Sequence, residues 1–308
     1  MGQVAMELIN VRKTIGKKEI IKGLSFKINE GEVFGLIGPN GSGKTTTIRM
    51  MVGLMKLTEG DVRIFGKSIQ TNFKEAVEKV GAIVENPEMY PFLTGWQNLK
   101  HYARMMPGIT KERIEEVIGL VGLEKAIHHK VSKYSLGMRQ RLGIAQALLH
   151  KPKVLILDEP TNGLDPAGMR EIREYIRHLA TEEKVSIIIS SHLLSEIEQM
   201  CDHIGIIQNG KLIAVQSIDE INESETTTER DITIEVVEID EATSLLQREF
   251  KIQSVKKNGT ISFQAEKEII PMIIKSFVNH DLTIFRVETE RLSLEDKFFD
   301  MIGENIIE

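Results

Sequence analysis

The sequence is poor in several features that define other classes of protein. One cysteine among 308 residues excludes an internal disulfide and a cysteine-rich zinc site. The strongest apolar runs, residues 154–157 and 187–189, are only long enough for strands, so no segment is predicted to cross a bilayer. The start, residues 1–7, lacks the basic segment and apolar core of a signal peptide. We therefore expect a cytosolic protein.

The sequence lacks the combination of clustered basic residues and interleaved aromatic residues that is typical of nucleic-acid-binding proteins. The net charge is −6, aromatic residues make up 5% of the chain, and no lysine or arginine run contains interleaved aromatics. We expect no nucleic-acid partner. The single cysteine, Cys201, stands beside Asp202 and His203; this cluster could bind a metal, but we interpret Cys201 as a small buried residue at a helix end.

One glycine-rich segment has the pattern of a phosphate-binding loop. A short apolar run, residues 33–37, suits a buried parallel strand before it, and residues 45–54 read as a helix after it. The segment that leads from this strand into the first residues of the helix consists of Gly38, Pro39, Asn40, Gly41, Ser42, Gly43, Lys44, Thr45 and Thr46. A strand, a glycine loop and a helix N-terminus therefore follow one another in the order that phosphate binding requires.

The chemistry of this loop is specific. Its glycines allow backbone conformations in which successive N–H groups point at phosphate oxygens, and the helix adds its positive end. Lys44 adds a full charge for the outer phosphates, while the Thr45 hydroxyl is placed to ligate Mg²⁺. The alternative is a glycine-rich turn with a chance lysine; the flanking strand and helix favour the phosphate loop.

A second strand ends in two acids. Four apolar residues, 154–157, precede Asp158 and Glu159, and ligands of parallel sheets bind at the carboxyl ends of strands. Beside a phosphate loop, the natural partner for Asp158 is Mg²⁺, and Glu159 is placed to polarise an attacking water. The alternative is a strand that ends in a solvated acidic turn.

The remaining patterns outline two domains, as the length and the 41% hydrophobic content allow. An antiparallel sheet is predicted from short strands at 4–10, 19–21, 24–28 and 62–65, followed by a short helix at 74–80. Residues 94–150 are helical in period, with breaks at 107–108 and 131–132. We predict a first domain at 1–222, a linker at 223–230 and a small domain at 231–308. The last has the order β-α-β-β-α-β, which suggests a ferredoxin-like fold.

Further motifs resemble those of ATP-binding cassette (ABC) ATPases. Residues 134–141 are similar to the family's signature sequence, residues 162–166 resemble its D-loop with Asp165, and His192 resembles its switch histidine. With the phosphate loop and the acidic strand end, five motifs stand in the family's order across about residues 4–220.

The resemblance implies the fold and the activity. It implies an α/β P-loop NTPase with a RecA-like core, an antiparallel β-subdomain and a helical subdomain, which uses ATP and Mg²⁺. Two cassettes would pair head to tail, so that ATP held by one chain faces the signature of the other. In that arrangement Glu159 is the general base and His192 contacts the γ-phosphate. The signature residues are Ser135, Leu136, Gly137 and Met138, and Ser135 is predicted to open a helix that runs to about residue 150.

Three positions depart from the family pattern. Glu85 stands where the family usually has glutamine, and it could still ligate Mg²⁺ but adds negative charge near the triphosphate. Leu136 and Met138 replace a glycine and a glutamine of the signature. Ile15 stands where an aromatic side chain often stacks on adenine, so it could cover the base with less stacking energy.

The loop residues are most similar to the bacitracin and lantibiotic branch of the drug and peptide exporters. That resemblance implies a separate transmembrane permease, a second ATP-binding subunit in a homodimer, and a place on the inner face of the membrane. Tyr90, Phe92 and Trp96 are candidate anchors for the permease, although they could equally be core aromatics. The alternative functions are a soluble cassette ATPase acting on DNA, ribosomes or cluster assembly, and a nucleotide-dependent regulator.

Overall fold

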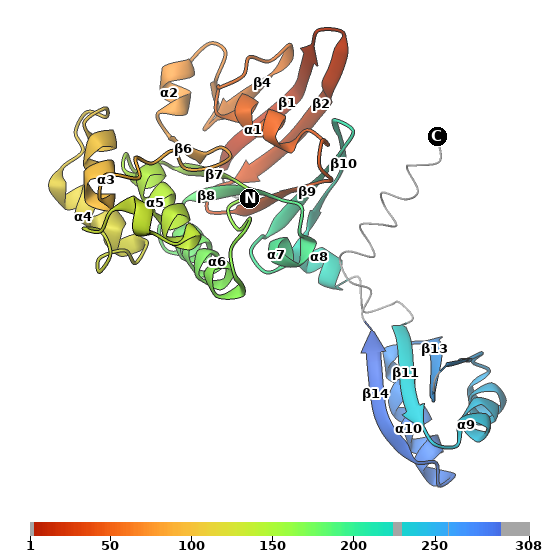
Figure 1. Ribbon diagram of the computed structural model, residues 1–308. Coiled ribbons are helices and arrows are strands. Elements are labelled where there is room, and N and C mark those ends of the chain that lie inside the picture. The colour runs from red at the N-terminus through yellow and green to blue at the C-terminus, as the bar shows by residue number, and fades with distance from the viewer. Residues whose placement is uncertain (1–2, 224–229, 258, 291–308) are drawn as a thin grey trace. The chain divides into compact units, whose positions relative to one another are not determined.

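The computed structural model describes residues 3–223, 230–257 and 259–290 (Figure 1). The chain divides into two compact units, residues 1–218 and 219–308. Most of the predicted linker and residues 291–308 of the predicted small domain lie outside the described residues. Across the described part of the chain, helices are too short or too polar to span a membrane.

The first unit is built on a mixed sheet of six strands in the order β10-β9-β3-β8-β7-β6. The five strands from β9 to β6 run parallel, and β10 pairs antiparallel with β9. Every residue of β3, β7 and β8 is buried, as the continuous apolar runs predict for strands covered on both faces. The bounds are β3 Val33–Ile37, β6 Val80–Ile83, β7 Val154–Asp158, β8 Ser186–Ser191, β9 His203–Gln208 and β10 Lys211–Ser217.

A second, antiparallel sheet lies beside it in the order β2-β1-β4-β5. Its strands are β1 Val4–Ile15, β2 Lys18–Asn29, β4 Glu59–Ile64 and β5 Lys67–Ser68. The pattern predicted two short strands at 19–21 and 24–28, which is wrong, because β2 is continuous. The pairing of β1 with β2 shifts register around Val11, and Gly23, at φ 90°, absorbs this irregularity, so the hydrogen-bonded ladder resumes beyond it.

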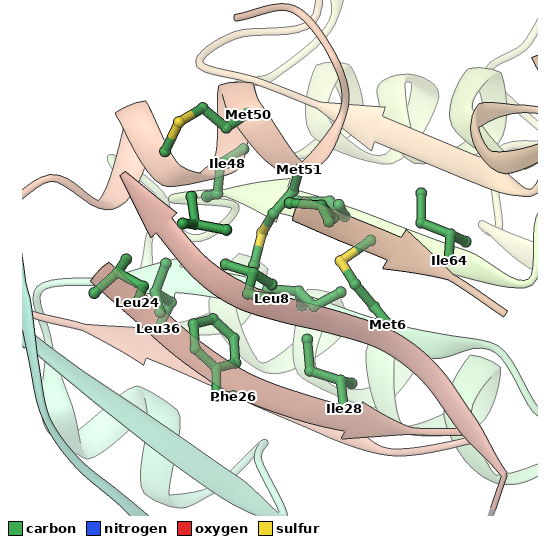
Figure 2. Packing of buried hydrophobic residues seen from close by; sticks show 14 of the residues in the cluster. Met6, Leu8, Leu24, Phe26, Ile28, Leu36, Ile48, Met50, Met51 and Ile64 are labelled. Carbon is green, nitrogen blue, oxygen red and sulfur yellow. The ribbon is translucent and has the colours of Figure 1, made fainter. Parts of the chain in front are cut away.

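One apolar core joins this sheet to helix α1, Lys44–Met51. Figure 2 shows Ile48, Met50 and Met51 of the helix above side chains of β1 and β2, among them Leu8 and Phe26. The helix that follows the phosphate loop is therefore fixed by buried apolar contacts.

The helices follow the predicted breaks. The helical region contains α3 Gly95–Ala103, α4 Lys111–Leu120, a 3₁₀ turn at Val131–Lys133 and α5 Leu136–Leu148. Thr94 and Thr110 cap α3 and α4 through their side chains. The other helices of this unit are α2 Phe73–Val77, α6 Pro166–Thr181 and α7 Leu194–Glu198. The predicted helix at 74–80 is too long, since Val80 already pairs in β6.

The second unit has a four-stranded antiparallel sheet in the order β12-β13-β11-β14. Its elements follow α8 Ile218–Glu223 and are β11 Arg230–Val236, α9 Ile239–Leu245, a π turn at Leu246–Phe250, β12 Val255–Lys257, β13 Thr260–Ala265, a 3₁₀ turn at Lys267–Ile269, α10 Ile270–Asn279 and β14 Ile284–Glu290. This is the predicted β-α-β-β-α-β order. Its core combines strand residues such as Ile232 with Phe277 of α10.

Candidate functional site

The phosphate loop connects β3 to α1 and has the backbone geometry that its glycines allow. Gly43 precedes the helix at φ 113°, a conformation that strains any residue with a Cβ. At Gly38, an added Cβ would lie 2.1 Å from the carbonyl oxygen of Ile207. Glycine is therefore required at Gly43 by conformation and at Gly38 by the close approach of β9.

The turn of the β9–β10 hairpin supports the loop. The Gly210 amide donates to the Ser42 carbonyl at 2.9 Å, and the Ser42 amide donates to the Pro39 carbonyl at 3.1 Å. Gly210 in turn accepts from the Lys22 amide of β2 at 2.8 Å. The Ser42 hydroxyl is buried and has no hydrogen-bond partner among the described residues. The Ser42 hydroxyl is therefore a polar group of the loop that a bound ligand could pair with.

Lys44 is a buried cation at the centre of the site, with a side chain only 6% exposed. Its Nζ donates to the Gly38 carbonyl at 2.7 Å and lies 3.8 Å from Glu159 Oε1. Burial lowers the pKa of Lys44, and the negative charges of Glu159 and Asp158 oppose part of that shift. Because the buried ammonium group has lost part of its hydration, an anion is a favourable partner for it.

The carboxyl end of β7 carries the two acids. Asp158 is 3% exposed and accepts a hydrogen bond from Ser190 Oγ of the neighbouring strand at 2.5 Å. The same Ser190 Oγ accepts from the Glu159 amide at 2.9 Å. Glu159 adopts φ 50°, a left-handed conformation that costs free energy for a residue with a Cβ and occurs often at functional sites. Ser190 therefore orients both acids, and sequence reasoning missed it.

His192 stands directly after β8, next to Glu159. Its Nδ1 lies 2.7 Å from Glu159 Oε2, within hydrogen-bond distance, and both side chains are partly exposed. Glu159 therefore touches Lys44 with one carboxylate oxygen and His192 with the other.

A cavity of about 360 Å³ opens over this arrangement. That volume lies within the usual range for small-molecule sites. It brings together eight of the predicted site residues and two others, Ile20 and Asn162. Its lining consists of Ile20, Asn40, Gly41, Gly43, Lys44, Thr45, Thr46, Glu159, Asn162 and His192. A larger cavity, of about 600 Å³, lies apart from these groups, beside Arg113 and His150.

The predicted site residues that do not line the phosphate-loop cavity include Ile15 and Glu85. Ile15 is exposed at the end of β1, and the apolar side chain that lines the cavity is Ile20 of β2. Glu85, at φ 68°, pairs with Arg49 of α1. Its carboxylate is therefore occupied by a cation of this chain.

The signature and D-loop residues begin two helices. Ser135 caps α5 and accepts from the Met138 amide at 3.2 Å, while Asp165 caps α6 and accepts from the Gly168 amide at 3.0 Å. The predicted helix starting at Ser135 is confirmed. The signature residues do not line the phosphate-loop cavity, whereas the D-loop, residues 162–166, contributes Asn162 to its lining. Leu136 packs beside the D-loop, because a Cβ at Gly163 would lie 3.1 Å from its Cδ2.

The residues at the loop fit a magnesium–triphosphate complex. Mg²⁺ in nucleotide sites is commonly held by one or two carboxylates together with substrate phosphates. The site offers the Thr45 hydroxyl and the Asp158 carboxylate. Among the described residues, no group of three or more histidine, cysteine, aspartate or glutamate side chains could hold a metal by itself.

Comparison with known proteins shows the family to which the chain belongs. The ABC transporter family model matches residues 21–162. The ABC transporter ATP-binding protein YhcH of Bacillus subtilis (strain 168), itself uncharacterized, is 53% identical over 98% of this chain and 97% of its own length. This chain belongs to the ABC transporter family. It is the ATP-binding subunit of an ABC transporter and an ATPase, which confirms the prediction from the five motifs.

Other ATP-binding subunits share its sequence and fold. The bacitracin transport ATP-binding protein BcrA of Bacillus licheniformis is 40% identical over 97% of both chains. A solved ATP-binding subunit of an ABC transporter is 28% identical, with a TM-score of 0.63 over 71% of this chain and 92% of that chain. Both favour the transport function over the soluble alternative. ATP-binding subunits of this family dimerise and work with a transmembrane permease.

Proposed function

We propose that this ATPase drives the export of antimicrobial peptides or drugs through a separate permease. The relatives named for bacitracin and lantibiotic transport support this substrate class. The predicted domains are part of the proposal: residues 1–222 bind ATP, 223–230 link, and 231–308 form an accessory domain. The protein would lie on the inner face of the membrane, held there by the permease.

The observation that carries the catalytic part is the contact of Glu159 with both Lys44 and His192. We propose that the loop amides and Lys44 bind the phosphates, and that Glu159 takes a proton from the attacking water. His192 then holds Glu159 in orientation through their 2.7 Å contact and reaches the γ-phosphate. General-base catalysis of this kind typically contributes about 10²- to 10⁴-fold in rate.

Thr45 and Asp158 are the proposed ligands of Mg²⁺, with Glu85 as a third. When bound, the metal supplies charge that stabilises the developing negative charge on the phosphates. Asp158 is already oriented by Ser190, at 2.5 Å. Glu85 has to leave Arg49 in order to act as a ligand, because its carboxylate pairs with that guanidinium.

A second copy of the chain completes the proposed site. Ser135 and Gly137 stand at the start of α5, whose first turn has free backbone N–H groups that suit a phosphate. We propose that the segment from Ser135 to Met138 faces the ATP of the partner chain and that Asp165 lies at the same interface. The intrachain contact of Leu136 with the D-loop would position the two segments together.

The permease is proposed to dock on the segment after β6. Phe92 is 65% exposed and Tyr90 is 42% exposed, and their rings lie 5.8 Å apart. Buried Asn98 fixes this segment: its Oδ1 accepts from the Tyr90 amide at 2.8 Å and its Nδ2 donates to the Tyr90 carbonyl at 3.1 Å. Trp96 of α3 is only partly buried. Exposed aromatic side chains on a fixed backbone are suitable anchors for a partner helix.

The proposal is tested by affinity purification of the chain from detergent-solubilised native membranes, with and without ATP. Recovery of a stoichiometric multi-span membrane protein supports the exporter and identifies the permease. The variant Phe92→Ala, which removes a proposed anchor, should recover less of that membrane protein while keeping the ATPase activity of the isolated chain. Recovery only from the soluble fraction, with ribosomes, DNA or an assembly complex, would contradict the proposal.

A further inference from the structure

A buried glutamate outside the phosphate-loop cavity has an incomplete set of partners. Glu196 of α7 is 6% exposed. Its Oε2 accepts a hydrogen bond from Thr161 Oγ1, whereas its Oε1 is buried without a hydrogen-bond partner among the described residues. A buried carboxylate oxygen that lacks a donor costs free energy, so stability alone does not account for an acid at this position.

The first partner of Glu196 belongs to the turn that follows Glu159. Thr161 is 3% exposed and stands two residues after Glu159, across Pro160. The Asn162 amide donates to the Glu159 carbonyl at 3.1 Å, and the Leu164 amide donates to the Thr161 carbonyl at 3.1 Å. A hydrogen bond at Thr161 therefore fixes the backbone that leaves Glu159, at which φ is strained.

The second contact of Glu196 reaches the segment that carries His192. Ser191 Oγ lies 3.5 Å from Glu196 Oε2, at the long limit of a hydrogen bond, and is 2% exposed as a residue. The same hydroxyl accepts from the Leu193 amide at 3.0 Å. Ser191 and Leu193 flank His192, so this hydroxyl holds the backbone on both sides of the histidine.

Through its two contacts, Glu196 joins the segment after Glu159 to the segment around His192, and these two segments lie far apart in the sequence. Thr161 and Glu196 are 35 residues apart, and Glu159 and His192 are 33 apart. The partly exposed pair, Glu159 and His192, lines the cavity, whereas the buried carboxylate of Glu196 contacts the hydroxyls of Thr161 and Ser191, which stand close in sequence to Glu159 and His192 respectively. Because Glu196 contacts both Thr161 and Ser191, it can hold the two segments at the spacing that gives the 2.7 Å distance between His192 Nδ1 and Glu159 Oε2.

We infer that Glu196 is a positioning residue for hydrolysis, which holds the Glu159 turn and the His192 segment in register through Thr161 and Ser191. The inference rests on the roles proposed above for Glu159 and His192. Glu196 touches neither of them through its side-chain hydrogen bonds, so it acts on the rate through geometry. Misplacement of catalytic groups by about 1 Å can cost about 10²-fold in rate.

The test compares purified full-length variants by steady-state ATPase activity, ATP affinity and thermal unfolding. Thr161→Val keeps the shape of the side chain but removes the donor, Thr161→Ser keeps the donor, and Glu196→Gln removes the charge. We expect Thr161→Val and Glu196→Gln to lower kcat at least about 10-fold with KM for ATP within about 2-fold, and Thr161→Ser to stay near wild type. Glu198→Gln, an exposed position on the same helix, is the matched control and should match wild type.

The energetic coupling between Thr161 and Glu196 provides a second measurement. If Thr161 and Glu196 act as one unit, the double variant Thr161→Val with Glu196→Gln loses no more kcat than the worse single variant. A purely structural role would lower the unfolding temperature and leave kcat per folded molecule unchanged, which would overturn the inference. Should Glu196→Gln fail to fold, the comparison of Thr161→Val with Thr161→Ser decides by itself.

Glu159→Gln is measured alongside to separate this inference from the proposed function. Loss of turnover in Glu159→Gln with full turnover in Thr161→Val overturns the positioning role alone. Full turnover in Glu159→Gln overturns the proposed role of Glu159, and the positioning role of Glu196 with it.

Discussion

His192 Nδ1 lies 2.7 Å from Glu159 Oε2, although 33 residues separate them in the sequence. The distance follows from the sheet, because β7 and β8 are adjacent parallel strands and each side chain stands just after the carboxyl end of its strand. Adjacent parallel strands bring their carboxyl ends to one edge of the sheet, where α/β proteins bind ligands. This contact, with Lys44 on the other oxygen of Glu159, defines the geometry of the proposed catalytic site.

Glu159→Gln is expected to retain ATP binding and to lose turnover by at least about 100-fold, because the amide keeps the shape of the side chain but cannot take a proton. ATP should then accumulate in a stable dimer. Size-exclusion chromatography with ATP and a phosphate-release assay measure both effects, and His192→Ala serves as a second variant of the same contact. Hydrolysis by Glu159→Gln at the wild-type rate would show that Glu159 is not the base.

Lys44→Met is expected to lose ATP binding without loss of stability. Because the folded pKa of Lys44 is below its ordinary value of 10.5, the unfolded chain binds this proton more tightly than the folded protein does. The contribution of this group to stability therefore rises with pH through the window between the folded pKa and 10.5, and at neutral pH its charge is a cost.

The free energy of unfolding of nucleotide-free Lys44→Met should accordingly equal that of wild type or exceed it by up to about 1 kcal/mol. Thermal unfolding with and without ATP is the measurement, and the variant should show no increase of Tm with ATP. Lys125→Met, at an exposed position, should retain that increase. A normal ATP-dependent increase in Lys44→Met would contradict the proposed phosphate contact.

Gly137→Ala separates folding from the proposed dimer contact. A Cβ at Gly137 would meet Leu164 Cδ2 at 3.7 Å, an ordinary contact, so the single chain has room for alanine. Helix α5 should even gain up to about 1 kcal/mol from the substitution. If a partner's phosphate approaches the Gly137 backbone, turnover should fall at least about 10-fold.

The matched control for Gly137→Ala is Gly119→Ala on α4, where a Cβ would meet only Glu124 Oε1, at 4.0 Å. That variant should show a similar gain in unfolding free energy and wild-type turnover. Equal turnover in both variants would argue against a ligand at Gly137.

Glu85→Gln restores the residue that the family usually has. The Arg49–Glu85 pair is partly exposed, so its loss should change the free energy of unfolding by no more than about 1 kcal/mol. If Glu85 ligates Mg²⁺, the Mg²⁺ concentration for half-maximal ATPase activity should rise several-fold. Glu88→Gln, an exposed glutamate of the same loop, should leave it unchanged. An unchanged Mg²⁺ dependence in Glu85→Gln would remove Glu85 from the metal site.

Local patterns in the sequence predicted the elements of the site. The phosphate loop, the acidic strand end and the helix starting at Ser135 depend on neighbouring residues: glycines that allow unusual φ, apolar runs that form buried strands, and a serine that caps the next helix. The prediction of two strands at 19–21 and 24–28 failed because the bulge at Gly23 depends on pairing with β1, which is not a local property.

The partners of the site residues were decided by the tertiary structure. Ser190 on Asp158, Gly210 on Ser42 and Thr161 on Glu196 each join segments that are at least 30 residues apart in the chain. The sequence by itself determined that this is a nucleotide-binding cassette, because the motifs are contiguous. Only the order of strands in the sheet decided which side chains meet, since hydrogen bonds form between neighbours in space and sequence spacing does not specify them.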